Sequence, residues 1–345
     1  MGDVARAPLG MTDVVIVGAG PCGLAAAISA RAAGLETLVF DAECVVSSIT
    51  HYPTYATFFS TAEKLSLGGL PFVTPGEKPS RRDALAYYRA VVRYFGIPIR
   101  QYEPVSRIEA NDGAFVVHTN RRGVDRQTEA KAVIVATGYW GSPNRLGVPG
   151  EDLPHVSHAY REGHYAFQQD AVVVGGGNSA AEAALDLWRS GARVTLVHFG
   201  PTFDKKIKPW VMPDFTNRVA EGSIRALWNT RVTEIVGEDV VVASSEGTSR
   251  LHADHVFLMT GFAPSVGLLK QVGVSIDTLT GIPTHDPQTL ETNIPGIFIA
   301  GVVTAGYDAN KVFIENGRFH GDQIVARLLG KPAPPPAKIS RDLDS

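Results

Sequence analysis

The clearest chemical signal in this sequence is a run of glycines, Gly18 to Gly23, with GxGxxG spacing. The run follows an apolar segment directly, and the next apolar segment ends at Asp41. In such a turn the first glycine permits a sharp bend, the second lets the backbone approach a pyrophosphate, and the third lets a helix pack closely. The acid can accept hydrogen bonds from a ribose hydroxyl. The pattern therefore predicts a dinucleotide site rather than a turn that serves packing alone.

A second glycine turn, Gly175 to Ala180, also follows an apolar segment and has the related GxGxxA spacing. The apolar segment after this turn ends at His198 instead of an acid, and Lys205 and Lys208 come shortly after. An acid would repel the 2′-phosphate of NADPH, whereas histidine and lysine attract it. We therefore predict an NADPH site, with a solvated loop as the alternative interpretation of the lysines.

Two dinucleotide sites in one chain imply two cofactors. We expect FAD at the site that ends in Asp41 and NADPH at the basic site. Such a pair supports hydride transfer from the nicotinamide to the flavin, followed by electron transfer to a substrate.

Repeated elements must position these turns. Residues 13–43 and 170–200 each contain an apolar strand, a glycine turn, an alanine-rich helix, a glycine stop and a second strand. A further helix is predicted over residues 81–95, with Ser80 as its N-cap and Gly96 at its end.

Three more apolar strands end in glycine, and a hairpin region follows each repeat, at residues 103–119 and 230–245. We therefore predict an α/β fold with two Rossmann-like domains, each a parallel sheet with an antiparallel β insert. The NADPH domain is expected to be inserted into the FAD domain. The expected boundaries are 1–150 plus 263–330 for the FAD domain, 151–262 for the NADPH domain, and 331–345 for a flexible, proline-rich tail.

Composition narrows the classes of function. The chain is 44% hydrophobic and 19% charged, so a core is available and disorder is excluded. With 32 basic and 35 acidic residues, the net charge of −3 gives no reason to expect a nucleic acid or a membrane as partner. No secretory signal is recognised in the first ten residues, and we expect a cytoplasmic protein. The two cysteines, Cys22 and Cys44, are too few for a disulfide framework, and no metal-binding motif is present.

The order of the two glycine turns resembles the low-molecular-weight thioredoxin reductase class of FAD and NADPH enzymes. The segment 293–301, NIPGIFIAG, is similar to the second FAD fingerprint of that class. The sequence departs from the class in two ways. Val302 replaces the Asp that usually binds the ribityl chain, and the segment 158–170 lacks the CxxC pair. The class implies a homodimer and a rotation of the inserted domain.

A closer resemblance is to the bacillithiol disulfide reductase family, over residues 12–330. It is carried by GPCGLAAAISA, ATGYWGSPN, GGGNSAAEAAL, GVVTAGYDANKVFIENGRFHG and the long block from Ser47 to Arg89. The family implies NADPH-dependent reduction of a small-molecule thiol disulfide, and it shares the GV that replaces GD at the last glycine.

Cys22 is the one candidate catalytic residue. It lies inside the first glycine turn, where a helix N-terminus favours a thiolate that could attack the substrate disulfide. Against this, the nearby pyrophosphate opposes a thiolate, and a small residue that only fills the turn is an equally good interpretation. Both interpretations stay open.

The turns and the resemblance together assign the binding residues. For FAD they are Gly18, Gly20, Pro21, Cys22, Gly23, Asp41, Ser48, Thr57, Phe59, Val105, Thr137, Gly138, Gly301 and Glu315. For NADPH they are Gly175, Gly177, Asn178, Ser179, Ala180, Glu182, His198, Lys205, Lys208 and Gly261. Arg318 and His320 are further candidates for contact with an acidic substrate, with a plain surface position as the alternative.

Three other functions compete with disulfide reduction. A ferredoxin or flavodoxin–NADP reductase has the same fold and also lacks redox cysteines. A flavin monooxygenase is less well supported because its FxGxxxHxxx fingerprint is missing after residue 144. A flavoprotein redox sensor is the alternative that is not an enzyme.

Overall fold

The structure is a computed structural model that describes residues 10–203, 207–332 and 334. It divides into two compact units. The first unit comprises the described parts of residues 1–50, 57–142 and 263–345, and the second comprises residues 51–56 and 143–262. Lys205 and most of the predicted tail lie outside the described residues.

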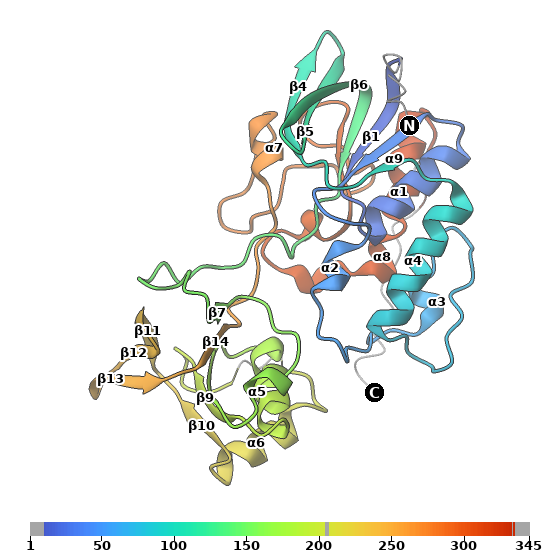
Figure 1. The fold of residues 1–345 in the computed structure, drawn as a ribbon. Helices are drawn as coiled ribbons and strands as arrows, with labels where there is room; N and C mark the ends of the chain where they lie inside the picture. The colour runs from blue at the N-terminus through green and yellow to red at the C-terminus, as the bar shows by residue number, and fades with distance from the viewer. Residues whose placement is uncertain (1–9, 204–206, 333, 335–345) are drawn as a thin grey trace, which may run out of the picture. The chain divides into compact units, whose positions relative to one another are not determined.

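A seven-stranded sheet forms the centre of the first unit. Its strand order is β3-β2-β1-β6-β5-β4, with β15 beside β6. Strands β1, β6, β5 and β4 are labelled in Figure 1. The bounds are β1 Thr12–Val17, β2 Thr37–Phe40, β3 Ile99–Arg100, β4 Val105–Asn111, β5 Ala114–Arg121, β6 Val124–Val135 and β15 Ile297–Ile299. Strand β6 belongs to two arrangements, because its second half pairs parallel with β1 and β15 while its first half pairs antiparallel with β5. The antiparallel insert is therefore an extension of a parallel-sheet strand.

Helices cover this sheet. Helix α1 (Pro21–Ala32) follows β1 and packs against α9 (His320–Leu328) from the far end of the chain. The packing is close, since a Cβ on Gly321 would lie 2.6 Å from the Cα of Ala26. The other helices of this unit are α2 Ser47–Thr50, α3 Ala62–Leu65, α4 Arg81–Phe95, α7 Gly267–Gln271 and α8 Ile314–Gly317, with short 3-10 turns at η2 Gly301–Ala305 and η3 Ala309–Lys311.

Helix α4 has the limits that the sequence predicts, and that prediction is confirmed. The Ser80 hydroxyl accepts a hydrogen bond from the Asp83 N–H at 3.2 Å, and the Asp83 carboxylate accepts one from the Ser80 N–H at 2.9 Å. This reciprocal pair is a capping box, which satisfies two N–H groups that the helix itself cannot. The helix stops at Gly96, whose φ of 58° is left-handed.

The second unit contains a five-stranded parallel sheet, ordered β10-β9-β8-β14-β7, and a three-stranded antiparallel sheet, ordered β11-β12-β13. The first sheet consists of β7 Val156–Ser157, β8 Asp170–Val174, β9 Arg193–Val197, β10 Ile224–Leu227 and β14 His255–Leu258. The second consists of β11 Arg231–Val236, β12 Asp239–Ser244 and β13 Gly247–His252. The helices are α5 Asn178–Arg189 and α6 Met212–Ala220, with a 3-10 turn at η1 His164–Ala166. The predicted fold class is confirmed.

Two segments that the sequence places in the first domain belong to the second unit. Residues 143–150 do so because Leu146 and Val148 pack into its core and the Pro149 carbonyl accepts the Ile235 N–H. Residues 51–56 do so because Thr54 is hydrogen-bonded to residues of this unit. Its N–H donates to the Arg161 carbonyl at 3.0 Å, and its hydroxyl donates to Glu162 at 2.9 Å. Among the described residues no helix is both long and apolar enough to cross a membrane.

Removing the α4 cap should destabilise the first unit. We expect Ser80→Ala to lower the free energy of unfolding by about 1 kcal/mol. Thermal unfolding and hydrogen exchange of the α4 amides measure the loss, and Ser245→Ala in an exposed turn is the control.

The loss should also depend on pH. The hydrogen bonds from Ser80 hold the pKa of Asp83 below its usual value, so the carboxylate stabilises the fold above the unfolded pKa. The difference between Ser80→Ala and the wild type should therefore shrink as the pH falls below about 4. A difference that stays constant on acidification would show that the hydrogen bond from the Ser80 hydroxyl to the Asp83 carboxylate contributes nothing.

Candidate functional site

The three glycine-ended strands of the first unit meet at one edge of the sheet. Strands β1, β6 and β15 are neighbours and run parallel, with Val17 opposite Val135 and Val135 opposite Ile299. The carboxyl ends of parallel strands lie at the same edge, which is where open α/β sheets bind ligands. Three of the predicted FAD residues, Gly18, Thr137 and Gly301, therefore lie at this edge.

The first glycine turn has the shape that a pyrophosphate requires. Gly18 has a φ of 111°, and its N–H donates to the Phe40 carbonyl at 2.7 Å. A Cβ on Gly23 would lie 2.0 Å from the Gly18 carbonyl oxygen, so a side chain there is excluded. A Cβ on Gly20, in contrast, would meet no described atom within 4 Å. The middle glycine thus faces open space at the N-terminus of α1.

Both helix N-termini suit an anion. Helices α1 and α5 begin after Gly20 and Gly177, and neither has a side-chain cap or an acidic residue in its first turn among the described residues. Their first N–H groups and the positive end of the helix dipole can therefore stabilise a phosphate. The residues present fit the phosphates of two dinucleotides.

Asp41 is tied to the turn that it follows. One carboxylate oxygen accepts the Ala19 N–H at 2.6 Å, and the other accepts the Glu43 N–H at 2.8 Å. Burial raises the pKa of Asp41, and these two hydrogen bonds partly oppose the rise. The carboxylate holds the glycine turn in position and keeps further lone pairs for a ribose hydroxyl.

The second turn repeats this geometry. A Cβ on Gly175 would lie 2.4 Å from the Met259 carbonyl oxygen, just after β14, and a Cβ on Gly177 would meet no described atom within 4 Å. The predicted residue Gly261 follows the same strand. The carboxyl ends of β8 and β14 therefore bring the turn and Gly261 to the same edge.

The predicted basic residues of this site differ in what they contact. The His198 ring lies against the turn, since a Cβ on Gly176 would be 2.3 Å from its Cε1 atom. Lys208 forms an ion pair with Glu182 at 2.8 Å, and its N–H donates to the Asn178 side chain. Lys208 and Glu182 are thus brought together and neutralise one another.

The other predicted FAD residues lie on separate segments of the first unit. Ser48 is in α2, Val105 opens β4, and Thr57 forms an isolated bridge with Ser80. Phe59 is 55% exposed. Glu315, in α8, accepts a hydrogen bond from the Ser60 hydroxyl, which connects the segment after Thr57 to the last helices.

Cys22 lies where two glycines leave room for its sulfur. A Cβ on Gly317 would be 2.7 Å from its Sγ atom, and a Cβ on Gly301 would be 3.0 Å from it. Burial raises the pKa of the Cys22 thiol to about 12, and the Glu315 carboxylate adds to the rise. The direction of this shift is opposite to the lowering that the sequence argument expects at a helix N-terminus, and its main cause is desolvation of the thiol.

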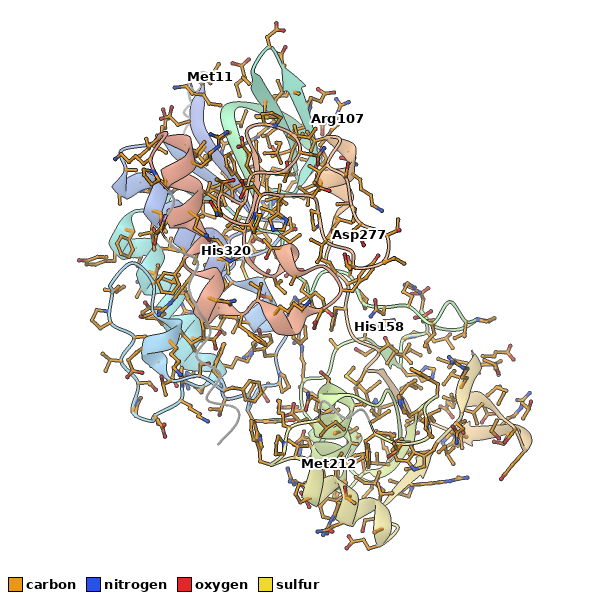
Figure 2. All side chains as sticks on the ribbon, turned by 180° about the vertical axis from the view of Figure 1, so that it is seen from behind. Met11, Arg107, His158, Met212, Asp277 and His320 are labelled. Atoms are coloured by element: carbon orange, nitrogen blue, oxygen red, sulfur yellow. The ribbon has the colours of Figure 1, made fainter. Side chains whose placement is uncertain are left out.

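The side chains of Arg318 and His320 are partly buried and hydrogen-bonded to backbone groups. The Arg318 guanidinium donates to the carbonyls of Glu63 and Ser66 at 2.8 and 2.6 Å. The His320 Nδ1 atom accepts the Gly301 N–H at 3.1 Å, at the start of α9 (Figure 2). Burial lowers the pKa of His320 to about 4, so the ring is neutral at pH 7 and can accept. No local sequence signal predicts these bonds, since each joins distant segments.

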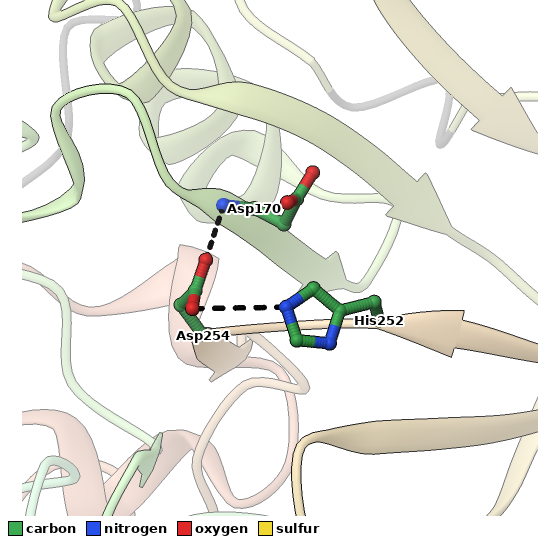
Figure 3. Close-up of side chains that lie close together, drawn as sticks. All are labelled: Asp170, His252 and Asp254. Carbon is green, nitrogen blue, oxygen red and sulfur yellow. Dashed lines mark hydrogen bonds and ion pairs between the residues drawn. The ribbon is translucent and has the colours of Figure 1, made fainter.

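An acidic cluster in the second unit has a structural explanation. Asp170, His252 and Asp254 lie close enough to share an ion (Figure 3). However, the Arg193 guanidinium binds both oxygens of Asp170, and Asp254 accepts the Asp170 N–H at 2.7 Å. The Asp170 charge is already balanced, and we assign no metal here.

Comparisons with known proteins agree with this geometry. The pyridine nucleotide-disulphide oxidoreductase family matches residues 15–301. The bacilliredoxin reductase Bdr of Bacillus subtilis (strain 168) is 45% identical over 316 residues, which cover 91% of this chain and 96% of that protein. A ferredoxin–NADP reductase of Ignicoccus hospitalis is 29% identical over 302 residues, covering 85% and 90%. Among solved structures, the bacillithiol disulfide reductase Bdr from Bacillus cereus has a TM-score of 0.90 at 43% identity, covering 93% of this chain and 99% of that one.

Two alanine substitutions should separate binding from folding. Gly20→Ala should keep the fold, because its Cβ meets open space, but should weaken FAD binding at least about tenfold by filling the space for the pyrophosphate. Gly23→Ala should instead destabilise the protein, because its Cβ clashes with backbone. Flavin content, FAD titration and thermal unfolding give the two readouts.

Gly141→Ala is the matched control, because it also adds a Cβ that meets no described atom within 4 Å. It should change neither stability nor flavin content. FAD binding by Gly20→Ala with wild-type affinity would mean that the turn does not hold the cofactor.

Proposed function

This chain belongs to the pyridine nucleotide-disulphide oxidoreductase family, and we propose that it reduces the disulfide of a small-molecule thiol, with bacillithiol disulfide as its substrate. The chain is an NADPH-dependent flavoprotein oxidoreductase, and its resemblance to the bacillithiol disulfide reductase family is confirmed. The observation that supports the substrate is the likeness, over nearly the whole chain, to relatives named for this thiol and its redox partner.

The two glycine turns have different proposed ligands. We propose that the turn after β1 and Asp41 bind FAD, and that the turn after β8 and His198 bind NADPH. When bound, FAD accepts a hydride from NADPH and supplies two electrons to the disulfide. We also propose that the other residues predicted for each site take part in binding its cofactor.

Cys22 is our proposed nucleophile. Its sulfur lies at the first turn of α1. Because Gly301 and Gly317 have no side chains, they leave room for this sulfur, and an alanine at position 22 would not require that room. The Cys22 thiolate attacks one sulfur of the substrate disulfide, which breaks the S–S bond, forms a mixed disulfide and releases the other half of the substrate as a thiolate. Reduced flavin, when bound, would supply the two electrons that cleave this mixed disulfide; with one proton, the cleavage would release the second thiol and restore the Cys22 thiolate.

The raised pKa of Cys22 has a consequence for this step. A thiol with a pKa of about 12 is protonated at neutral pH, so the attack requires that a proton leave first. Glu315 is the carboxylate that acts on this thiol electrostatically, and its charge opposes the loss of the proton.

The ferredoxin–NADP reductase reading is the second candidate, favoured by the relative from Ignicoccus hospitalis. That activity needs no thiol in the protein, so dependence on Cys22 separates the two functions. A cytoplasmic location and a homodimer complete the proposal, and both rest on the resemblance to the bacillithiol disulfide reductase family and the thioredoxin reductase class.

NADPH oxidation with bacillithiol disulfide is the direct test. Cys22→Ala should lower the rate of disulfide reduction at least about a hundredfold, a loss of about 2.7 kcal/mol of transition-state stabilisation. The reduction of bound FAD by NADPH should stay unchanged. Cys44→Ala, which removes the other thiol of the chain, is the control and should keep wild-type turnover.

Two outcomes contradict the proposal at different points. Full activity of Cys22→Ala would exclude the thiol mechanism while leaving the substrate in place. A wild-type enzyme that reduces ferredoxin but no disulfide would favour the second candidate.

The pH dependence of alkylation gives an independent check. Because the pKa of Cys22 lies far above neutrality, the thiolate fraction should rise about tenfold per pH unit between about pH 6 and 10. The rate at which iodoacetamide modifies Cys22 in the holoenzyme, measured by mass spectrometry, should rise in parallel. A plateau near pH 7 would show that this thiol is already ionised.

A further inference from the structure

We infer that Arg231 is the residue that recognises the 2′-phosphate of NADPH and thereby selects it over NADH. The inference rests on the proposed function, because it assumes that the second glycine turn binds a nicotinamide dinucleotide. Of the two lysines expected to supply this charge, Lys205 lies outside the described residues and Lys208 is paired with Glu182.

An exposed aromatic ring lies just beyond the carboxyl end of β9. Phe199 comes two residues after the last residue of the strand and is 61% exposed. Its ring centroid lies 4.7 Å from that of His198, whose own ring is pressed against Gly176 in the glycine turn. An exposed aromatic ring thus lies beside the position where the adenosine of a dinucleotide would leave the turn.

Arg231 is held over this ring by backbone pairing. The Thr230 N–H donates to the His198 carbonyl at 3.0 Å, and the Asn229 N–H donates to the Gly200 carbonyl at 2.9 Å. These bonds bring the start of β11 against the end of β9. The guanidinium carbon of Arg231 then lies 4.7 Å from the centroid of the Phe199 ring.

The charge of Arg231 is available to a ligand. Its side chain is exposed, and among the described residues it has neither an ion-pair partner nor a hydrogen-bond partner beyond the Phe199 ring. Lys208, whose backbone N–H donates to the Asn178 side chain at the second glycine turn, is already paired with Glu182 at 2.8 Å. A phosphate that reaches the end of β9 would therefore meet an unneutralised guanidinium at Arg231.

Guanidinium chemistry suits the ligand. Its planar, forked N–H groups can bind two oxygens of one phosphate, and the group stays charged at all relevant pH values. Stacking on Phe199 restricts the orientation of the fork before the ligand arrives, so less conformational entropy is lost on binding. NADH has no 2′-phosphate and gains nothing from this contact.

Binding of two small probes to the holoenzyme tests the inference without turnover. The ligand 2′,5′-ADP carries the 2′-phosphate, whereas 5′-AMP lacks it and is otherwise the same. By isothermal titration, Arg231→Gln should weaken 2′,5′-ADP binding at least about tenfold and change 5′-AMP binding less than about twofold. Phe199→Leu should weaken 2′,5′-ADP binding by about threefold, whereas Phe199→Tyr, which keeps an aromatic ring, should bind 2′,5′-ADP with wild-type affinity.

Arg225→Gln is the matched control, since it removes an exposed arginine charge from the adjacent strand β10. It should leave both affinities unchanged. Equal weakening of both probes by Arg231→Gln, or no weakening of either, would overturn the inference. Loss of the preference for 2′,5′-ADP in Lys208→Gln but not in Arg231→Gln would return the role to the lysine. A wild-type protein with no preference at all would mean that the NADPH assignment itself fails.

Discussion

The close approach of a helix to the strand before it is the constraint on which both candidate sites depend. In the first unit a Cβ on Gly23 would lie 2.0 Å from the Gly18 carbonyl oxygen, so α1 can come this near β1 only where side chains are missing. A similar condition recurs in the second unit, where a Cβ on Gly175 would lie 3.2 Å from the Cβ of Ala180 in α5. This closeness directs each helix N-terminus toward the sheet edge where the parallel strands end, and the dipoles and open middle glycines follow from it.

Sequence reasoning succeeds here where the cause is local. The glycine spacings, the Ser80 cap and the strand patterns each act within a few residues, and they predict the fold class and the limits of α4. It fails where the cause joins distant segments. The Lys208–Glu182 pair and the His320–Gly301 hydrogen bond depend on how elements pack, and no spacing rule encodes them. Segment 51–56 is a similar case, because its partners lie about a hundred residues further along the chain.

Electrostatics in this molecule depends on what is already paired. Lys208 is positive by type but neutralised in place, and Asp170 is acidic but bound by Arg193. Cys22 shows the same principle for a neutral group. Its position at a helix N-terminus favours ionisation, whereas its burial and Glu315 oppose it more strongly. Such a thiol reacts slowly with alkylating agents and oxidants, since these attack the thiolate. Residue type therefore gives the sign of an interaction, and the surroundings decide its size.

The placement of residues 51–56 has a consequence for dissecting the protein. The chain passes from one unit to the other at 50/51, 56/57, 142/143 and 262/263. A fragment expressed as 143–262 would therefore lack Thr54 and Tyr55, and Arg161, Glu162 and Asp186 would lose their partners from that segment. The second unit is not one contiguous stretch of polypeptide. A gene fragment that encodes residues 143–262 alone would therefore give an incomplete second unit. Expression of the whole unit requires that residues 51–56 be joined to this fragment through a linker.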